Sequence, residues 1–129
     1  FFNVYGPNMD PDGPYALVIG KFLKLKNEGT PLTITGDGEQ TRDFTHVDDI
    51  VRANIHAMTS EKVGGGEVLN VGRGHNVSVN ALAKLIGGPV EYIEKRLEPR
   101  DALADISRAK DLLGWEPELS LKEGLKELF

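Results

Sequence analysis

The chain has 129 residues, 40% of them apolar, and its 15 Lys and Arg against 20 Asp and Glu give a formal net charge of −5. It contains no cysteine, which excludes disulfides, cysteine-based zinc sites and thiol nucleophiles. The length suits one domain, the acidic balance argues against nucleic-acid binding, and no apolar stretch approaches the roughly 20 residues that cross a bilayer.

The first part of the chain predicts a strand, a loop and a helix. Apolar and β-forming residues at 1–5 predict a strand, so that the chain begins inside one, and turn residues at 6–14 predict a loop. From Tyr15 onward apolar residues recur at helical spacing. We expect this helix to end near Gly29, which suits a left-handed cap.

Two short strands are expected next. Residues 32–35 and 42–47 are rich in β-branched or alternating residues and flank a glycine turn. Alternation places Arg42, Phe44 and His46 on one side of the second strand. This arrangement puts a cation beside an aromatic ring at the mouth of a turn.

The second half repeats the alternation of helices and strands. Asp48 is expected to cap a helix whose apolar face carries Ile50, Val51, Ile55 and Met58. The later elements predicted are a strand at 68–71, a helix capped by Ser78, a strand at 90–93, a helix at 107–113 closed by Gly114, and a last helix opened by the capping-box pair Ser120 and Glu123. This order predicts one α/β domain over residues 1–129 with partly parallel pairing.

Two common kinds of site find weak support. The turn Gly72-Arg73-Gly74 is the only candidate for a dinucleotide phosphate loop, but it lacks the third glycine, so we interpret it as a plain turn. His46, His56 and His75 have no ligand-like spacing, so we predict structural or solvent-facing roles for them and no metal site.

Arg42 allows two interpretations. It could form a surface ion pair with Asp43 or Asp48, which is common and contributes little. It could instead clamp an anion, because the guanidinium presents a planar fork to phosphate oxygens. The residues alone slightly favour the ion pair and leave both open.

A second polar segment lies at 94–101, where cations and carboxylates stand two to four residues apart in an expected loop. Such a loop suits a ligand that is anionic at one end and rich in hydroxyls at the other. A mixed, solvated surface loop is the simpler interpretation.

Taken together, several motifs resemble the NAD-dependent nucleotide-sugar epimerase/dehydratase family, the extended short-chain dehydrogenases. The motifs are Phe2-Asn3-Val4-Tyr5-Gly6-Pro7, Gly36-Asp37-Gly38, residues 42–49, Asn70-Val71-Gly72, Ala104-Asp105-Ile106-Ser107 and Leu113-Gly114-Trp115-Glu116-Pro117. The similarity covers nearly the whole chain but only the family's C-terminal, substrate-binding portion. The family's glycine-rich NAD loop and Tyr-x-x-x-Lys pair are absent, which implies that this chain holds no catalytic residue and is inactive alone.

The resemblance also implies binding residues. Those for the substrate are Asn3, Leu17, Val18, Ile34, Thr35 and Arg42, with Arg42 matching the family's diphosphate-binding arginine. In the second loop, Lys95 and Glu98 align with the Arg and Asp of the family's Arg-Pro-Gly-Asp segment, Arg96 lies one position off, and Arg100 lies close by. Phe2 and Asn3 are the implied contacts to NAD, and Thr35 is smaller than the aromatic residue often found at its position.

The implied parent is a cytoplasmic, homodimeric enzyme that interconverts UDP-glucose and UDP-galactose. A tyrosine outside this chain would take a proton while hydride passes to NAD, and the keto sugar would turn and take the hydride back. The present portion would hold the nucleotide diphosphate still. One alternative is a dehydratase or decarboxylase of the same family, which product analysis on UDP-glucose with the intact protein distinguishes. The other is a non-catalytic binding module, which the intact mass of the natural protein distinguishes.

Overall fold

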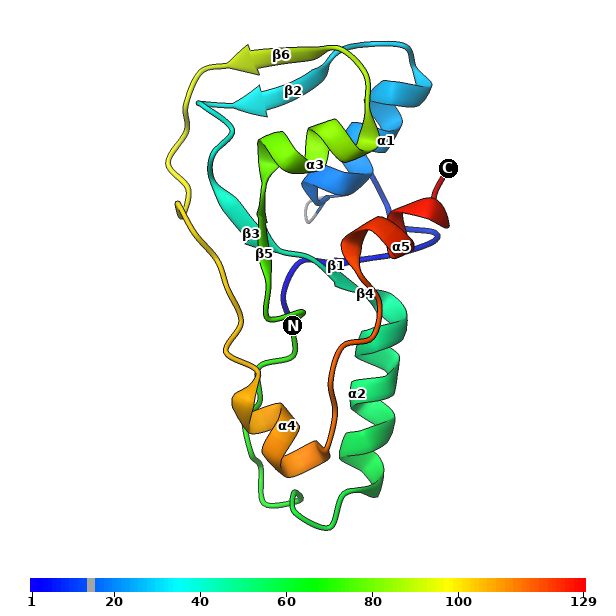
Figure 1. The fold of residues 1–129 in the computed structure, drawn as a ribbon, viewed down its shortest axis with the longest axis vertical. Helices are drawn as coiled ribbons and strands as arrows, with labels where there is room; N and C mark the ends of the chain where they lie inside the picture. The colour runs from blue at the N-terminus through cyan, green and yellow to red at the C-terminus, as the bar shows by residue number, and fades with distance from the viewer. Residues whose placement is uncertain (14–15) are drawn as a thin grey trace.

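The computed structural model describes residues 1–13 and 16–129. In chain order the elements are β1 (Val4–Tyr5), α1 (Val18–Asn27), β2 (Leu32–Thr35), β3 (Thr41–Asp43), β4 (Thr45–His46), α2 (Val47–Thr59), β5 (Asn76–Ser78), α3 (Val79–Ile86), β6 (Val90–Ile93), α4 (Ser107–Leu113) and α5 (Leu121–Lys126). The predicted α/β class is confirmed. The chain is elongated, with β2 and β6 at one end and α2 and α4 at the other (Figure 1).

The strands form three pairs. β1 lies parallel to β4 and β2 lies parallel to β6, whereas β3 and β5 are antiparallel. Partly parallel pairing was predicted. Because β6 pairs with β2, the loop after β6 returns toward the ends of β2 and β3 (Figure 1).

Two separate apolar clusters hold the described residues together. The larger one packs α1 and α3 against β2 and includes residues of α5, which lies against β4; among its members are Ile19, Phe22, Leu32, Ile34 and Leu82. The smaller one fills the space between α2 and α4, around Trp115. Burial of apolar area in each cluster fixes the helices that pack on it.

Most predicted helix ends are confirmed. The Ser78 hydroxyl accepts from the Ala81 N–H, and Ser120 with Glu123 forms a complete capping box. Gly29 and Gly114 take the left-handed conformation with φ of 70° and 61°. The predicted start at Tyr15 lies outside the described residues, and α1 begins at Val18.

The predicted cap of α2 was wrong. His46 caps this helix, because its ring Nδ1 accepts the Asp48 N–H at 3.3 Å, and Asp48 lies in the first turn instead. The predicted apolar face was also wrong in part. Ile50 is buried, but Val51, Ile55 and Met58 are exposed.

The predicted strand at 42–47 is divided at Phe44. The residues before Phe44 pair with β5, and the residues after it pair with β1. The alternation of side chains between two faces therefore does not continue from 42 to 47. Arg42 consequently belongs to a different sheet from the buried His46, and the buried Phe44 lies between the two strands. The first strand is shorter than predicted, because Asn3 has a φ of 33° and only Val4 and Tyr5 pair.

The predicted strand at 68–71 is not formed. Its backbone contact to the start of the chain is a single bond from the Phe2 N–H to the Val71 carbonyl at 3.1 Å, and one bond does not make a ladder. The three-residue strand β5, which ends at the helix cap Ser78, was not predicted. In the described part of the chain, no helix is long and apolar enough to cross a membrane.

Helix α5 packs so closely on the chain's start that a single methyl group should disturb it. A Cβ added at Gly124 would lie 2.8 Å from His46 Cδ2 and closer still to the Tyr5 hydroxyl. Gly124→Ala should therefore destabilise the protein by about 1–3 kcal/mol, although alanine normally favours a helix. Denaturant unfolding of the variant measures this.

Gly20 in α1 is the matched control. A Cβ there meets the flexible Met9 side chain first, with Sδ at 3.1 Å, so Gly20→Ala should cost much less. Equal unfolding midpoints for the two variants would contradict the close packing of α5 on Tyr5 and His46.

Candidate functional site

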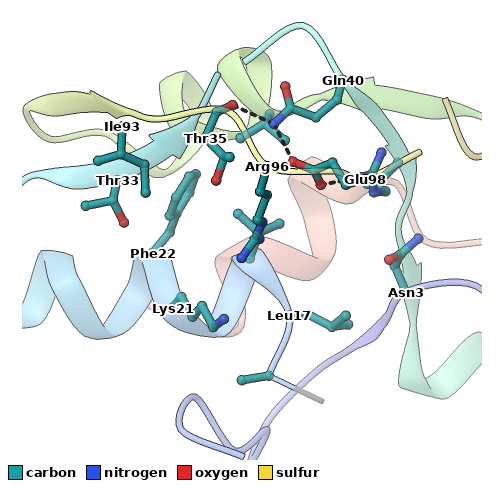
Figure 2. A pocket seen from close by; sticks show the side chains of 14 residues that line it. Asn3, Leu17, Lys21, Phe22, Thr33, Thr35, Gln40, Ile93, Arg96 and Glu98 are labelled. Atoms are coloured by element: carbon teal, nitrogen blue, oxygen red, sulfur yellow. Dashed lines mark hydrogen bonds and ion pairs between the residues drawn. The ribbon is translucent and has the colours of Figure 1, made fainter. Parts of the chain in front are cut away.

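A cavity of about 400 Å³ lies between α1, the end of β2 and the loop that follows β6. Its lining residues are Asn3, Ala16, Leu17, Val18, Lys21, Phe22, Thr33, Thr35, Gln40, Arg42, Val79, Ile93, Arg96 and Glu98. Figure 2 shows Thr33, Thr35 and Ile93 on the strand side and Lys21 with Phe22 on the helix side. The volume is in the range of small-molecule sites.

Arg42 lies at one wall of this cavity. Its Nη2 is 2.6 Å from Glu98 Oε2, and its Nη1 donates to the Thr41 carbonyl at 2.8 Å. The side chains of Arg42 and Glu98 are 15% and 24% exposed, so the pair is partly shielded from water. An ion pair is present, but the predicted partners Asp43 and Asp48 were wrong.

Gln40 joins this pair to the end of β2. Its buried amide donates to the Thr35 carbonyl at 2.9 Å and to Glu98 Oε1 at 3.4 Å (Figure 2). Both carboxylate oxygens of Glu98 are therefore engaged, one by Gln40 and one by Arg42. The role of Gln40 was not predicted, because nothing in its local pattern distinguishes it from a solvated turn residue.

Two further cations face the cavity without a salt bridge to any described carboxylate. Lys21 extends from α1 and Arg96 from the loop after β6, toward the same space (Figure 2). With Arg42 they give the cavity lining three cations and one carboxylate, that of Glu98. Lys21 was also missed, although its position one helical turn after Val18 puts both on one face.

Most of the predicted substrate residues come together here. The cavity is lined by Asn3, Leu17, Val18, Thr35, Arg42, Arg96 and Glu98. Ile34 is buried in the larger apolar cluster and does not line it. Whether any of these residues binds a substrate stays a prediction.

Lys95 and Arg100 line a smaller adjoining cavity of about 60 Å³. There Arg100 Nη1 lies 2.7 Å from Asp37 Oδ1, and this hydrogen bond lowers the pKa of Asp37 below its ordinary value. Arg100 thus already has an anionic partner. The two cavities share Thr35, Gln40, Arg96 and Glu98.

The predicted cofactor contacts are tied to the protein's own backbone. The Phe2 N–H is donated to the Val71 carbonyl, and the Asn3 side-chain amide donates to the Asp43 carbonyl at 2.9 Å. Asn3 also lines the cavity, whereas Phe2 does not. Their role toward a cofactor stays a prediction.

The Gly72-Arg73-Gly74 turn serves the fold. The N–H groups of Arg73 and Gly74 donate to the Asp43 carboxylate at 2.8 and 2.9 Å, which leaves neither for a phosphate. A Cβ at Gly72 would overlap Ala104, so the first glycine is required by close packing. The interpretation as a plain turn agrees with these contacts.

The histidine roles also follow from contacts. His46 is buried and accepts the Asp48 N–H at Nδ1, and its Nε2 lies 3.5 Å from Glu127 Oε2. His46, Asp48 and Glu127 are close enough to hold a metal ion, but Nδ1 of His46 is already occupied by the Asp48 N–H. The hydroxyl of Tyr5 is buried next to this ring, and burial raises the pKa of Tyr5. His56 bonds to the Leu113 carbonyl at 3.0 Å, and His75 is exposed.

Comparison with known proteins gives matches over nearly the whole chain. The model of the NAD dependent epimerase/dehydratase family matches residues 1–72. A UDP-glucuronate 4-epimerase of Thermodesulfobacterium geofontis is 43% identical over 98% of this chain and 39% of the relative. A UDP-N-acetyl-alpha-D-glucosaminuronate decarboxylase of Bacillus cytotoxicus is 37% identical over 98% of this chain and 43% of the relative.

One solved structure is similar to this chain in both sequence and fold. The crystal structure of a UDP-glucose 4-epimerase from Thermotoga maritima with UDP-glucose is 43% identical and superposes with a TM-score of 0.87, covering 98% of this chain and 42% of that chain. The chain therefore spans about two-fifths of the length of the proteins it matches.

Proposed function

Because the chain belongs to the NAD-dependent epimerase/dehydratase family, we propose that it is the nucleotide-sugar-binding part of a UDP-sugar 4-epimerase whose substrates are UDP-glucose and UDP-galactose. The observation that carries the proposal is the cavity at which Lys21, Arg42 and Arg96 converge. Although the chain has a net charge of −5, three cationic side chains line this cavity, and such a cluster of positive charge suits a diphosphate.

The rest of the cavity suits a nucleoside. Phe22 and Ile93 offer apolar surface, and Thr33 and Thr35 offer hydroxyls and strand backbone at the opposite wall from Lys21 (Figure 2). A cavity with apolar walls and a few convergent polar groups is typical of small-molecule sites. In this assignment Arg42 and Arg96 hold the diphosphate, and the β2 side receives the base and ribose.

The proposed contribution of this chain to the reaction is positioning. Binding energy from the nucleotide diphosphate, remote from the reacting sugar carbon, restrains the substrate while the chemistry occurs elsewhere. NAD supplies hydride chemistry in this family, but the N–H groups of Arg73 and Gly74 are already bonded to the Asp43 carboxylate, and the Phe2 N–H is bonded to the Val71 carbonyl. The described residues thus do not fit NAD by themselves, and we expect the chain alone to catalyse no epimerisation.

Arg42→Ala in the complete protein should weaken UDP binding by about 1.5–3 kcal/mol, the usual contribution of a charge-assisted hydrogen bond. That loss corresponds to roughly a ten- to hundredfold higher Kd. Isothermal titration calorimetry with UDP measures it directly.

The control is Arg108→Ala, which removes the same charge at a distance from the cavity, where Arg108 bonds to the Val68 carbonyl. Its UDP affinity should match that of the wild type. Unchanged UDP affinity in Arg42→Ala would remove Arg42 from the site.

A second candidate is a reaction on a UDP-uronate. It is supported by the relatives at 43% and 37% identity, whose names specify a UDP-glucuronate epimerase and a uronate decarboxylase. Incubating the complete protein with UDP-glucose and UDP-glucuronate in turn, and identifying the products by NMR, separates the two. A product lacking the carboxylate would replace the epimerase proposal with decarboxylation.

A further inference from the structure

The middle of the loop after β6, residues 94–99, is held by side-chain bonds rather than by the backbone. The two ends of the loop are fixed at the Ile93 and Arg100 carbonyls, which accept backbone N–H groups at 3.0 and 2.8 Å. Between these ends, in the part of the chain that the structure describes, residues 94–99 form no backbone–backbone hydrogen bond. Glu98 is the only residue of 94–99 that is not exposed. Its carboxylate is therefore the hydrogen-bonded anchor of the loop.

Two side chains hold this anchor. Arg42 Nη2 lies 2.6 Å from Glu98 Oε2, and the Gln40 amide donates to Glu98 Oε1 at 3.4 Å. The same amide group donates to the Thr35 carbonyl at 2.9 Å, at the end of β2 (Figure 2). Because Gln40 is only 6% exposed, its neighbours restrict its movement. Gln40 thus connects the anchor of the loop to a strand of the fold.

The position of this loop determines part of the cavity lining, because Arg96 and Glu98 both reach the cavity from it. We propose that Gln40 is a positioning residue: it holds Glu98 against the end of β2 and thereby keeps Arg96 and Glu98 in place to line the cavity. The inference rests on the proposed function, since the ligand concerned is a nucleotide diphosphate. Both hydrogens of the Gln40 amide are used within the protein, so Gln40 acts on the ligand through Glu98.

The physical effect is preorganisation. An exposed loop without backbone bonds loses conformational freedom when it closes on a ligand, and this loss lowers the affinity. A loop that is already held before the ligand arrives loses less. Gln40 should therefore raise the affinity for the nucleotide.

The first test is a double-mutant cycle on the complete protein, with UDP binding measured by calorimetry. Gln40→Met keeps the length of the side chain but donates no hydrogen bond, and it should raise the Kd for UDP about tenfold. In a Glu98→Ala background the same substitution should change the Kd by less than about twofold, because the residue through which Gln40 acts is already gone. A general loss of structure would weaken binding equally in both backgrounds.

The second test uses trypsin on the ligand-free protein, because the loop carries the exposed residues Lys95 and Arg96. Gln40→Met and Glu98→Ala should both be cleaved after these residues several-fold faster than the wild type, since the loop is no longer anchored.

Asn80→Leu is the matched control for both tests. It removes an amide that donates to the Asp37 carbonyl at 2.9 Å, close to Gln40 in the chain, at a residue that lines neither cavity. Asn80→Leu should match the wild type in UDP affinity and in the rate of cleavage in the loop.

Three results would overturn the proposal: an unchanged Kd for UDP in Gln40→Met, an effect of Gln40→Met that is equally large without Glu98, or unchanged cleavage in the loop. Cleavage requires no ligand. A wild-type protein that does not bind UDP would contradict the proposed function, while the trypsin result would still decide whether Gln40 holds the loop through Glu98.

Discussion

Trp115→Ala should destabilise the protein by about 3–5 kcal/mol, the usual cost of truncating a buried aromatic side chain to alanine. Trp115 is fully buried, at 0% exposure, in the smaller apolar cluster. Its indole N–H also donates to the Asp49 carbonyl at 3.1 Å, so the substitution leaves both a cavity and an unpaired carbonyl. Since whole domains have only about 5–15 kcal/mol of stability, this loss should lower the unfolding midpoint markedly.

Trp115→Phe separates the two contributions. Phenylalanine fills most of the space but cannot donate to Asp49, so it should cost clearly less than alanine does. Because Trp115 is the chain's single tryptophan, both substitutions remove the tryptophan fluorescence signal. Unfolding by denaturant is therefore followed by far-UV circular dichroism. An alanine variant with the wild-type midpoint would show that the cluster between α2 and α4 contributes little.

Local sequence signals predicted the parts of the fold that depend on local chemistry. Ser78, Ser120 with Glu123, and Gly114 end or begin helices where expected, because a cap depends on residues within one turn. Strand pairing depends on partners far along the chain and was predicted less well. Residues 68–71 have strand-like composition but find no partner ladder in the described chain, and the division at Phe44 follows from two different partners.

The same distinction applies to the cavity. Arg42 and the segment around Glu98 were singled out by type and by motif, and the structure places the two side chains against each other. Their contact could not be predicted, because it joins residues 56 positions apart through the β2–β6 pair. Gln40 carries no local signal and Lys21 carries only its helical spacing from Val18, since the relevance of both comes from the elements that fold over them.

Asp43 should matter nearly as much to stability as Trp115 does, although it is a charged residue. Its carboxylate is fully buried and accepts three backbone N–H groups, from Arg73 at 2.8 Å, Gly74 at 2.9 Å and Ala104 at 3.1 Å. It thereby joins β3 to two loops 30 and 61 residues further along the chain. Hydrogen bonds to a charged group contribute about 1.5–3 kcal/mol each, and an unpaired buried donor is costly.

Asp43→Asn should therefore destabilise the protein by about 3 kcal/mol, even though the side chain keeps its size. The amide offers one acceptor oxygen where the carboxylate had two, and its NH₂ group must face an N–H donor. Asp111→Asn makes the same chemical change at an exposed residue and should stay within about 0.5 kcal/mol of the wild type. Chemical denaturation of both variants gives the comparison. Because Asp43 also fixes the strand that carries Arg42, we expect UDP affinity to fall in Asp43→Asn and to be unchanged in Asp111→Asn; equal stability of the two variants would mean that the three N–H groups find other acceptors.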